Sequence, residues 1–354
     1  MKHKNSFDFV RFVAASLVIV SHSFVLTGHN EPHIGNITLG GFGVWIFFIL
    51  SGYLISTSWK QYPRFNVFFA KRFLRIFPGL FVALLLSIVI CGTFFSDLSL
   101  KEYILNSSTL TYLNNIILIN TQYNLPGVFS DNIYPNAVNG SLWTLAYEFT
   151  MYISVGLLGV LALINRKPVL RIWATLLALM ILTIVFNLPL VNYSIFYINI
   201  FLIIQLALMF YTGILIQEYK EKIIFKSIYG LISLIAFLLL ATLFPRFSNI
   251  FAAIFLGYAV LGIGFSPIMS WFGKYGDYSY GMYIYSFPIQ QSIVAITSTT
   301  NALKMIILSF ILSVLCGALS WFFIESKALK WKSKINYNKY PLSKNETNST
   351  QRAW

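Results

Sequence analysis

Apolar residues form long, nearly unbroken runs along this chain. Ten segments are long and apolar enough to cross a bilayer, because a spanning helix needs about 20 consecutive apolar residues. Their approximate cores are 7–27, 40–59, 73–95, 142–164, 169–187, 195–216, 225–244, 248–265, 278–297 and 303–325. The pattern therefore predicts an all-α, polytopic membrane protein with about ten transmembrane helices in one bundle.

Basic residues concentrate on alternate connections between these segments. One set of connections holds only Lys101, Arg246 and Lys304. The other set, together with the ends of the chain, holds most of the rest, including Lys60, Arg64, Lys71, Arg166, Lys167, Lys220, Lys222 and Lys274. Cytoplasmic connections of membrane proteins carry the excess of Lys and Arg, so both termini are predicted to be cytoplasmic.

One outer connection, residues 96–141, is much longer than the others. Its apolar positions predict a helix lying on the membrane surface, ended by Pro126, Gly127 and Pro135; they are Leu100, Tyr103, Ile104, Leu110, Leu113 and Ile117. Loops of this length are commonly functional. The remaining organisation is simple: a membrane domain over 1–326 and a basic cytoplasmic tail over 327–354 that is expected to touch anionic lipid.

Composition supports this class and excludes others. The 354 residues are 57% hydrophobic and 10% charged, against about 25% charged in soluble proteins. The net charge of +14 lies in short runs between apolar segments, so membrane topology explains it and no nucleic-acid partner is predicted. Cys91 and Cys316 both fall inside apolar spans, which gives no disulfide framework or metal motif.

Ionisable residues inside the apolar segments indicate a polar cavity, because each costs about 2.5–3.5 kcal/mol to insert. Arg11 and His22 are eleven residues apart, about 16 Å and three turns plus about 20°, so they share one face of the first helix. Glu148 lies in the fourth segment at nearly the depth of His22. The two could form a His–carboxylate couple in which the imidazole acts as a general base.

Two further arginines, Arg72 and Arg75, are one helical turn apart at the start of the third segment, so their guanidinium groups point the same way. With Arg11 they could hold a cytoplasmic polyanion, since arginine binds phosphate bidentately. Ordinary interpretations stay open: the pair can be topology signals, and His22 a hydrogen-bonded interface residue. These residues alone do not separate an enzyme from a transporter.

Six short strings, in order, resemble the signatures of the membrane acyltransferase-3 family, from about Phe7 to Lys327. They are Phe7-Asp8-Phe9-Val10-Arg11 running to His22, the stretches 47–55, 72–78 and 142–149, Gly276-Asp277-Tyr278-Ser279-Tyr280 running to Pro288, and 321–325. Matched residue to residue, Arg11 and His22 fit the family's Arg-x10-His motif. Arg72 and Arg75 fit its Arg-x-x-Arg motif.

Glu148 fits the family's glutamate after Trp-Ser-Leu, although Thr144 takes the place of the serine. Ser286 stands where many members have a histidine, so no role of that histidine transfers to this chain. The resemblance implies a ten-helix enzyme of a bacterial cytoplasmic membrane. Such an enzyme moves an acyl group, usually acetyl, from cytoplasmic acetyl-CoA to a hydroxyl of a cell-surface glycan or its lipid-linked precursor.

The resemblance also implies roles for particular residues. The CoA phosphates would bind Arg72, Arg75 and Arg11. His22 would remove the acceptor's proton or carry the acyl group itself, with Glu148 stabilising the imidazolium and Arg11 part of the same catalytic group. No permanently bound cofactor and no metal is expected. Weaker candidates for substrate contact, which could instead be an aromatic belt and a packing residue, are Tyr278, Tyr280, Tyr283 and Ser51.

A rival hypothesis is a transporter or flippase of a lipid-linked or anionic substrate, since buried Arg, His and Glu suit transport too. Against it, the chain shows no obvious internal duplication of the kind many transporters carry. The expected partners are membrane lipid, the glycan acceptor and glycan-assembly enzymes. The residues identify neither the acceptor nor the oligomeric state.

Overall fold

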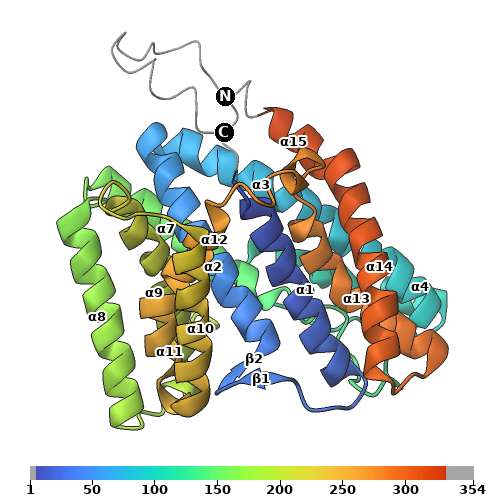
Figure 1. Cartoon of the computed structure of the whole chain (residues 1–354). Coiled ribbons are helices and arrows are strands. Elements are labelled where there is room, and N and C mark those ends of the chain that lie inside the picture. Colours follow the sequence, from blue (N-terminus) through green and yellow to red (C-terminus); the bar gives the residue numbers. More distant parts are fainter. Residues whose placement is uncertain (1–4, 332–354) are drawn as a thin grey trace.

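The computed structural model of the protein describes residues 5–331 and is a bundle of long helices (Figure 1). The long helices are α1 (Phe7–Leu26), α2 (Leu39–Gln61), α3 (Phe65–Leu86), α7 (Trp143–Val160), α8 (Arg166–Val185), α9 (Ile200–Glu218), α10 (Ser227–Leu243), α13 (Ser279–Thr297) and α14 (Ala302–Ser320). A further helical run joins α11 (Ser248–Phe251), the π-helical turn η5 (Ala252–Leu256) and α12 (Gly257–Gly264). The strands of the described part are two antiparallel pairs of two-residue strands, β1 (His33–Ile34) with β2 (Ile37–Thr38) and β3 (Ser194–Ile195) with β4 (Ile198–Asn199).

The predicted all-α membrane fold is confirmed in its main features. Each of the ten predicted segments falls on a helix or a continuous helical run. Within residues 5–331, seven helices are long and apolar enough to cross a membrane. Helices α7 and α13 are not among the seven, and both carry polar side chains that line the pocket described below. The ten-span count and the cytoplasmic termini stay predictions.

Helix α1 lies inside the bundle, where it packs against α2, α13 and α14. Its buried face contains Ala14, Ala15 and Ile19, each with no exposed surface, so its neighbours approach closely. In Figure 1, α1 begins at the end of the bundle where α15 (Ser326–Lys330) ends. The last helix continues from α14 through η7 (Trp321–Glu325) into α15. The predicted domain boundary after residue 326 therefore falls within a helix. The part of the predicted tail beyond residue 331 lies outside the described residues.

Helices α2 and α9 cross at a point where only glycine fits. A Cβ on Gly52 would lie 1.9 Å from the carbonyl oxygen of Phe210, and a Cβ on Gly213 would lie 2.0 Å from that of Ile49. Small residues at helix contacts allow backbones to approach closely inside membranes. This crossing sets the position of α2, whose other face forms one side of the pocket.

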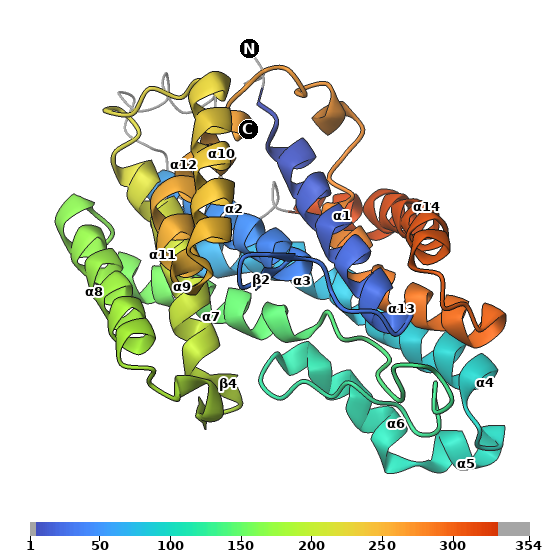
Figure 2. The same ribbon diagram turned by 60° about the horizontal axis from the view of Figure 1, so that its bottom comes forward.

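The long outer loop is helical, but not the single surface helix that its apolar positions predict. It contains three short pieces, α5 (Leu100–Leu105), α6 (Ser107–Thr111) and the 3-10 helix η2 (Tyr112–Ile117), which form a layer with other loop residues at one end of the bundle (Figure 2). The break comes at Asn106, whose side chain accepts a hydrogen bond from the Ser108 amide and caps α6.

The loop's apolar side chains are not all on one face, as a single surface helix would require: some are buried and others are exposed. Tyr103 and Tyr112 are buried, and the Tyr103 hydroxyl donates to the carbonyl of Ile88 in the π-helical turn η1 (Ser87–Cys91) that joins α3 to α4 (Gly92–Phe95). The exposed apolar residues include Leu100, Ile104, Leu105, Leu110, Ile117 and Ile119. The tyrosines therefore hold the loop to the bundle, and the leucines and isoleucines are left exposed.

Candidate active site

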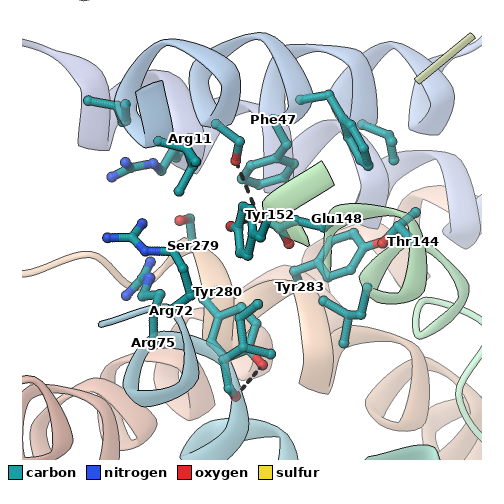
Figure 3. A pocket seen from close by; sticks show the side chains of 17 residues that line it. Arg11, Phe47, Arg72, Arg75, Thr144, Glu148, Tyr152, Ser279, Tyr280 and Tyr283 are labelled. Atoms are coloured by element: carbon teal, nitrogen blue, oxygen red, sulfur yellow. Dashed lines mark hydrogen bonds between the residues drawn. The ribbon is translucent and has the colours of Figure 1, made fainter. Parts of the chain in front are cut away.

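A pocket lies among α1, α2, α3, α7 and α13 (Figure 3). Along α2 it extends from Val44 to Ile55, roughly 16 Å at 1.5 Å per residue. Figure 3 shows the three arginines on one side of the pocket and Glu148, Thr144 and Tyr283 on the other. The lining residues are Arg11, Val44, Phe47, Phe48, Ser51, Leu54, Ile55, Arg72, Arg75, Ile76, Thr144, Leu145, Glu148, Tyr152, Ser279, Tyr280 and Tyr283.

Two arginines from different helices meet at one carboxylate. Arg11 of α1 and Arg75 of α3 approach the same oxygen of Asp277, with Nη1–Oδ2 and Nη2–Oδ2 distances of 3.1 and 2.5 Å. The other oxygen accepts hydrogen bonds from the Ser279 amide and hydroxyl. Burial raises the pKa of Asp277, but Arg75 and Arg11 together with Ser279 outweigh it and hold that pKa below its ordinary value of 3.8, so Asp277 is ionised at neutral pH. Asp277 therefore joins α1 and α3 to the residues that precede α13.

These two arginines have further carboxylate partners. Arg75 Nη1 lies 3.3 Å from Oε2 of the fully buried Glu325, which also accepts a hydrogen bond from Ser320. Arg11 Nη1 lies 2.8 Å from Asp8 Oδ1. The positive charges of Arg11 and Arg75 are thus compensated within the protein.

Arg72 is different from both. Its side chain is buried, with 9% of the residue's surface exposed, and its hydrogen bond to the Ser58 hydroxyl is long at 3.5 Å. Its Nε has no partner, and its guanidinium carbon lies 6.0 Å from the ring centres of Phe68 and Tyr152. Within residues 5–331 no carboxylate forms an ion pair with it. A buried cation without a counterion is costly unless an anion joins it, so this end of the pocket is suited to bind one.

Glu148 of α7 is held by two hydroxyl groups. Ser51 Oγ donates to its Oε1 over 3.2 Å, and the Tyr152 hydroxyl donates to the same oxygen. Ser51 thus lines the pocket, beyond a mere packing role. Tyr152, which the sequence did not single out, follows Glu148 by one helical turn, and that spacing is the signal that identifies it. Its ring lies between Glu148 and Arg72.

The tyrosines of α13 separate into two kinds. Tyr283 lines the pocket, donates to the carbonyl of Ser141 over 2.9 Å and lies 2.6 Å from the hydroxyl of Thr144. Tyr280 also lines it, and its hydroxyl donates to the carbonyl of Ile76.

Tyr278 does not line the pocket, and its contact with substrate stays a prediction. Its hydroxyl donates to the carbonyl of Tyr275 over 2.6 Å, and its ring centre lies 6.0 Å from that of Phe322. It precedes the first turn of α13 and is directed away from the pocket, which agrees with the alternative of an aromatic residue at the membrane interface.

His22 lies beyond the outer end of the pocket. Its ring packs edge-on against Phe287, with the ring centres 5.2 Å apart. Phe287 follows the pocket residue Tyr283 by one turn of α13, which is about 5.4 Å along the helix. The Nδ1 atom of His22 is buried and has no hydrogen-bond partner in the described chain.

The predicted direct couple between His22 and Glu148 is wrong. The Glu148 carboxylate is bonded to Ser51 and Tyr152, and none of the hydrogen bonds within residues 5–331 joins it to His22. Equal depth does not make two residues neighbours: α1 packs mainly against α2, α13 and α14, whereas α7 packs against α2, α3 and α9.

Comparison with known proteins identifies the class. The family model described as the acyltransferase domain matches residues 4–325. The chain belongs to the acyltransferase-3 family. One relative of this acyltransferase is the O-acetyl transferase of Shigella phage Sf6, which is 31% identical over 347 residues, 93% of this chain and 97% of the phage protein.

More distant relatives match about half of the chain. Nodulation protein 10 of Rhizobium leguminosarum bv. viciae is 29% identical over 167 residues, 44% of each chain. The acyltransferase MdmB of Streptomyces mycarofaciens is 26% identical over 171 residues, 46% of this chain and 41% of that protein. No solved structure matches the chain. The family and the apolar helices together make this protein a multi-pass membrane acyltransferase.

Proposed function

We propose that this acyltransferase moves an acetyl group from cytoplasmic acetyl-CoA to a hydroxyl of a cell-surface polysaccharide or its lipid-linked precursor, in a bacterial cytoplasmic membrane. The observation that carries the proposal is Arg72, a buried guanidinium without a counterion in the pocket of a membrane acyltransferase. The phage relative over nearly the whole chain is named an O-acetyl transferase, which supports transfer to an oxygen.

The arginine side of the pocket would bind the phosphates of the donor. Arg72 supplies a charge that no carboxylate in the described chain neutralises, and Arg11 and Arg75 stand beside it. A phosphate reaching Arg11 and Arg75 competes with Asp277 for the same guanidinium groups. The rest of the donor would extend along α2 toward Glu148, over a pocket roughly 16 Å long. The donor is a co-substrate that binds and leaves.

The reaction is an acyl transfer from sulfur to oxygen. The acceptor oxygen attacks the thioester carbonyl, the carbon–sulfur bond breaks, and the products are the O-acyl ester and CoA with a free thiol. The proton leaves the acceptor hydroxyl through His22 as general base and ends on the CoA sulfur. Glu148 supplies a negative charge between the arginines and the outer end of the pocket. The Ser51 and Tyr152 hydroxyls that bond to Glu148 fix the position of that charge.

The test is transfer of isotopically labelled acetyl from acetyl-CoA by the purified protein in lipid nanodiscs, with the host's de-O-acylated glycan as acceptor. We expect labelled ester and free CoA thiol in equal amounts from the wild type. We expect neither product from His22→Ala, although that variant folds and inserts. As a matched control, Arg166→Gln removes an arginine outside the pocket that is 44% exposed and contacts Glu221 and the Glu218 carbonyl, and it should leave the rate unchanged.

The transport hypothesis predicts a different result in the same membranes. A transporter or flippase would move a lipid-linked substrate across the bilayer without acyl-CoA, and would form no ester. Movement without acyl-CoA, together with no thiol release, would contradict the acyl-transfer proposal.

A further inference from the structure

A second hollow lies in the outer loop, outside the pocket of the arginines. It has about 870 Å³ of empty space, open solvent included, and is lined by Asn106, Ser108, Gln122, Tyr123, Asn124, Leu125, Pro126 and Asn136. None of these residues is charged. The lining combines side-chain amides, a hydroxyl and one tyrosine, a chemistry unlike that of the arginine pocket and unlike a site for an anion.

The walls of this hollow are held in place by hydrogen bonds. Gln122 uses its whole amide: Nε2 donates to the carbonyls of Ser108 and Asn124 over 2.9 and 3.0 Å, and Oε1 accepts from the Thr111 hydroxyl. The buried Asn115 bonds to the backbone of Gln122 in both directions. The hollow is therefore a built structure, in which Gln122 supports the shape.

Other polar groups at the hollow are left free. The side-chain amides of Asn124 and Asn136 are exposed, and neither has a hydrogen-bond partner in the described chain. Each amide offers two donors and an acceptor. The Tyr123 side chain lies among them with 39% of the residue's surface exposed. Free amides beside an aromatic ring suit a ligand that is neutral, rich in hydroxyl groups, and apolar on the faces of its rings.

The hollow is connected to the pocket through one short segment. Asn136 at the hollow is eight residues before Thr144 in the pocket. The segment between them is hydrogen-bonded to α13: Gln291 Nε2 donates to the carbonyl of Ala137, and Asn139 Nδ2 donates to the carbonyl of Ile284. Phe287, which packs on His22, also touches this segment at Gly140.

We propose that this outer-loop hollow binds neutral sugar units of the acyl acceptor, beside the outer end of the pocket where His22 lies. The proposal rests on the proposed function and adds the place and the chemical class of the acceptor. Pyranose hydroxyls would bond to Asn124 and Asn136, and the C–H face of a ring would pack on Tyr123. The same sugar chemistry can come from a lipid-linked precursor or from finished polysaccharide, and the test below distinguishes the two.

The test measures acceptor and donor kinetics separately, with protein in nanodiscs. The probes are the de-O-acylated polysaccharide and the lipid-linked precursor, both extracted from cells that lack the protein. We expect Tyr123→Leu and Asn124→Ala each to raise the acceptor KM about three- to tenfold, the effect of one lost contact of ordinary strength. The acetyl-CoA KM, and the slow hydrolysis of acetyl-CoA without acceptor, should not change. Matched controls at exposed outer positions are Tyr193→Leu and Asn30→Ala.

The outcomes separate the two proposals. Unchanged acceptor KM in both variants overturns the sugar site while leaving acyl transfer intact. A wild type that neither hydrolyses acetyl-CoA nor forms ester contradicts the proposed function instead. A raised KM for the lipid-linked precursor alone identifies that source, and a raised KM for both probes shows that the sugar units are sufficient. A variant that loses the donor reaction as well has lost its fold, and Asn124→Asp, which keeps the side-chain shape, then replaces Asn124→Ala.

Discussion

Replacing Arg72 by methionine should weaken donor binding and yet stabilise the free protein. In the structure Arg72 has one long hydrogen bond, at 3.5 Å, and no counterion within residues 5–331. Its burial therefore costs free energy that weak contacts with Phe68 and Tyr152 only partly offset. Methionine removes the charge and keeps an unbranched apolar stem like that of arginine, a kind of change that is often neutral or stabilising by about 1–4 kcal/mol.

Donor binding should change in the opposite direction. A charge-assisted hydrogen bond contributes about 1.5–3 kcal/mol, so its loss should raise the acetyl-CoA KM about ten- to a hundredfold. The matched variant is Arg75→Met, three residues away. It leaves the buried Glu325 without its cation, which should cost about 3–5 kcal/mol of stability.

The assay heats detergent-solubilised protein without ligand, measures the fraction still monodisperse by size-exclusion chromatography, and determines the acetyl-CoA KM of the same samples. We expect Arg72→Met to be at least as heat-stable as the wild type, and Arg75→Met to be clearly less stable. The reasoning is refuted if both variants lose stability equally and Arg72→Met keeps the wild-type KM, because Arg72 would then be a structural residue.

Three further predictions concern other parts of the pocket and its support. Glu148→Gln, which keeps the shape but removes the charge, should lower kcat about 10²- to 10⁴-fold with little change in the acetyl-CoA KM; steady-state kinetics that show only a raised KM would contradict this. Asp277→Asn should reduce heat stability at neutral pH. The pKa of Asp277 is depressed in the folded protein, so its contribution is present above the unfolded value of 3.8 and is lost as pH falls through the lower folded value; melting curves of the variant and the wild type should therefore converge in acid. Gly52→Ala places a Cβ 1.9 Å from the carbonyl oxygen of Phe210 and should destabilise by about 1–3 kcal/mol, whereas Gly41→Ala, near side chains only, should cost less; equal losses would exclude close backbone packing as the cause.

The parts of the fold that depend on composition could be predicted from the sequence. Long apolar runs can satisfy their backbone hydrogen bonds in a membrane only as helices, and every predicted run is helical. The gathering of Arg11, Arg72 and Arg75 also follows, because charges on apolar helices must face a polar interior. Glu148 lines the same pocket for the same reason.

Contacts that depend on which helices are neighbours could not be predicted. Depth along a helix follows from residue counting, but the order of helices around α1 does not. The sequence therefore predicts that His22 and Glu148 meet, whereas α1 and α7 share only α2 among their main neighbours. Asp277 precedes a helix in the sequence, and its ion pairs with Arg11 and Arg75 appear only when three chain segments meet. The outer hollow is assembled by hydrogen bonds between residues up to 14 positions apart, for which the sequence carries no periodic signal.

The most direct test of acyl transfer is mass spectrometry of the host's surface glycans before and after mild alkali. The compared cells would contain the wild-type protein, His22→Ala, or no copy of the protein, with membrane expression verified. We predict an alkali-labile acetyl mass on a glycan only with the wild type, which identifies donor group and acceptor together. Identical glycan profiles in all three cells would contradict O-acylation of a surface glycan by this protein.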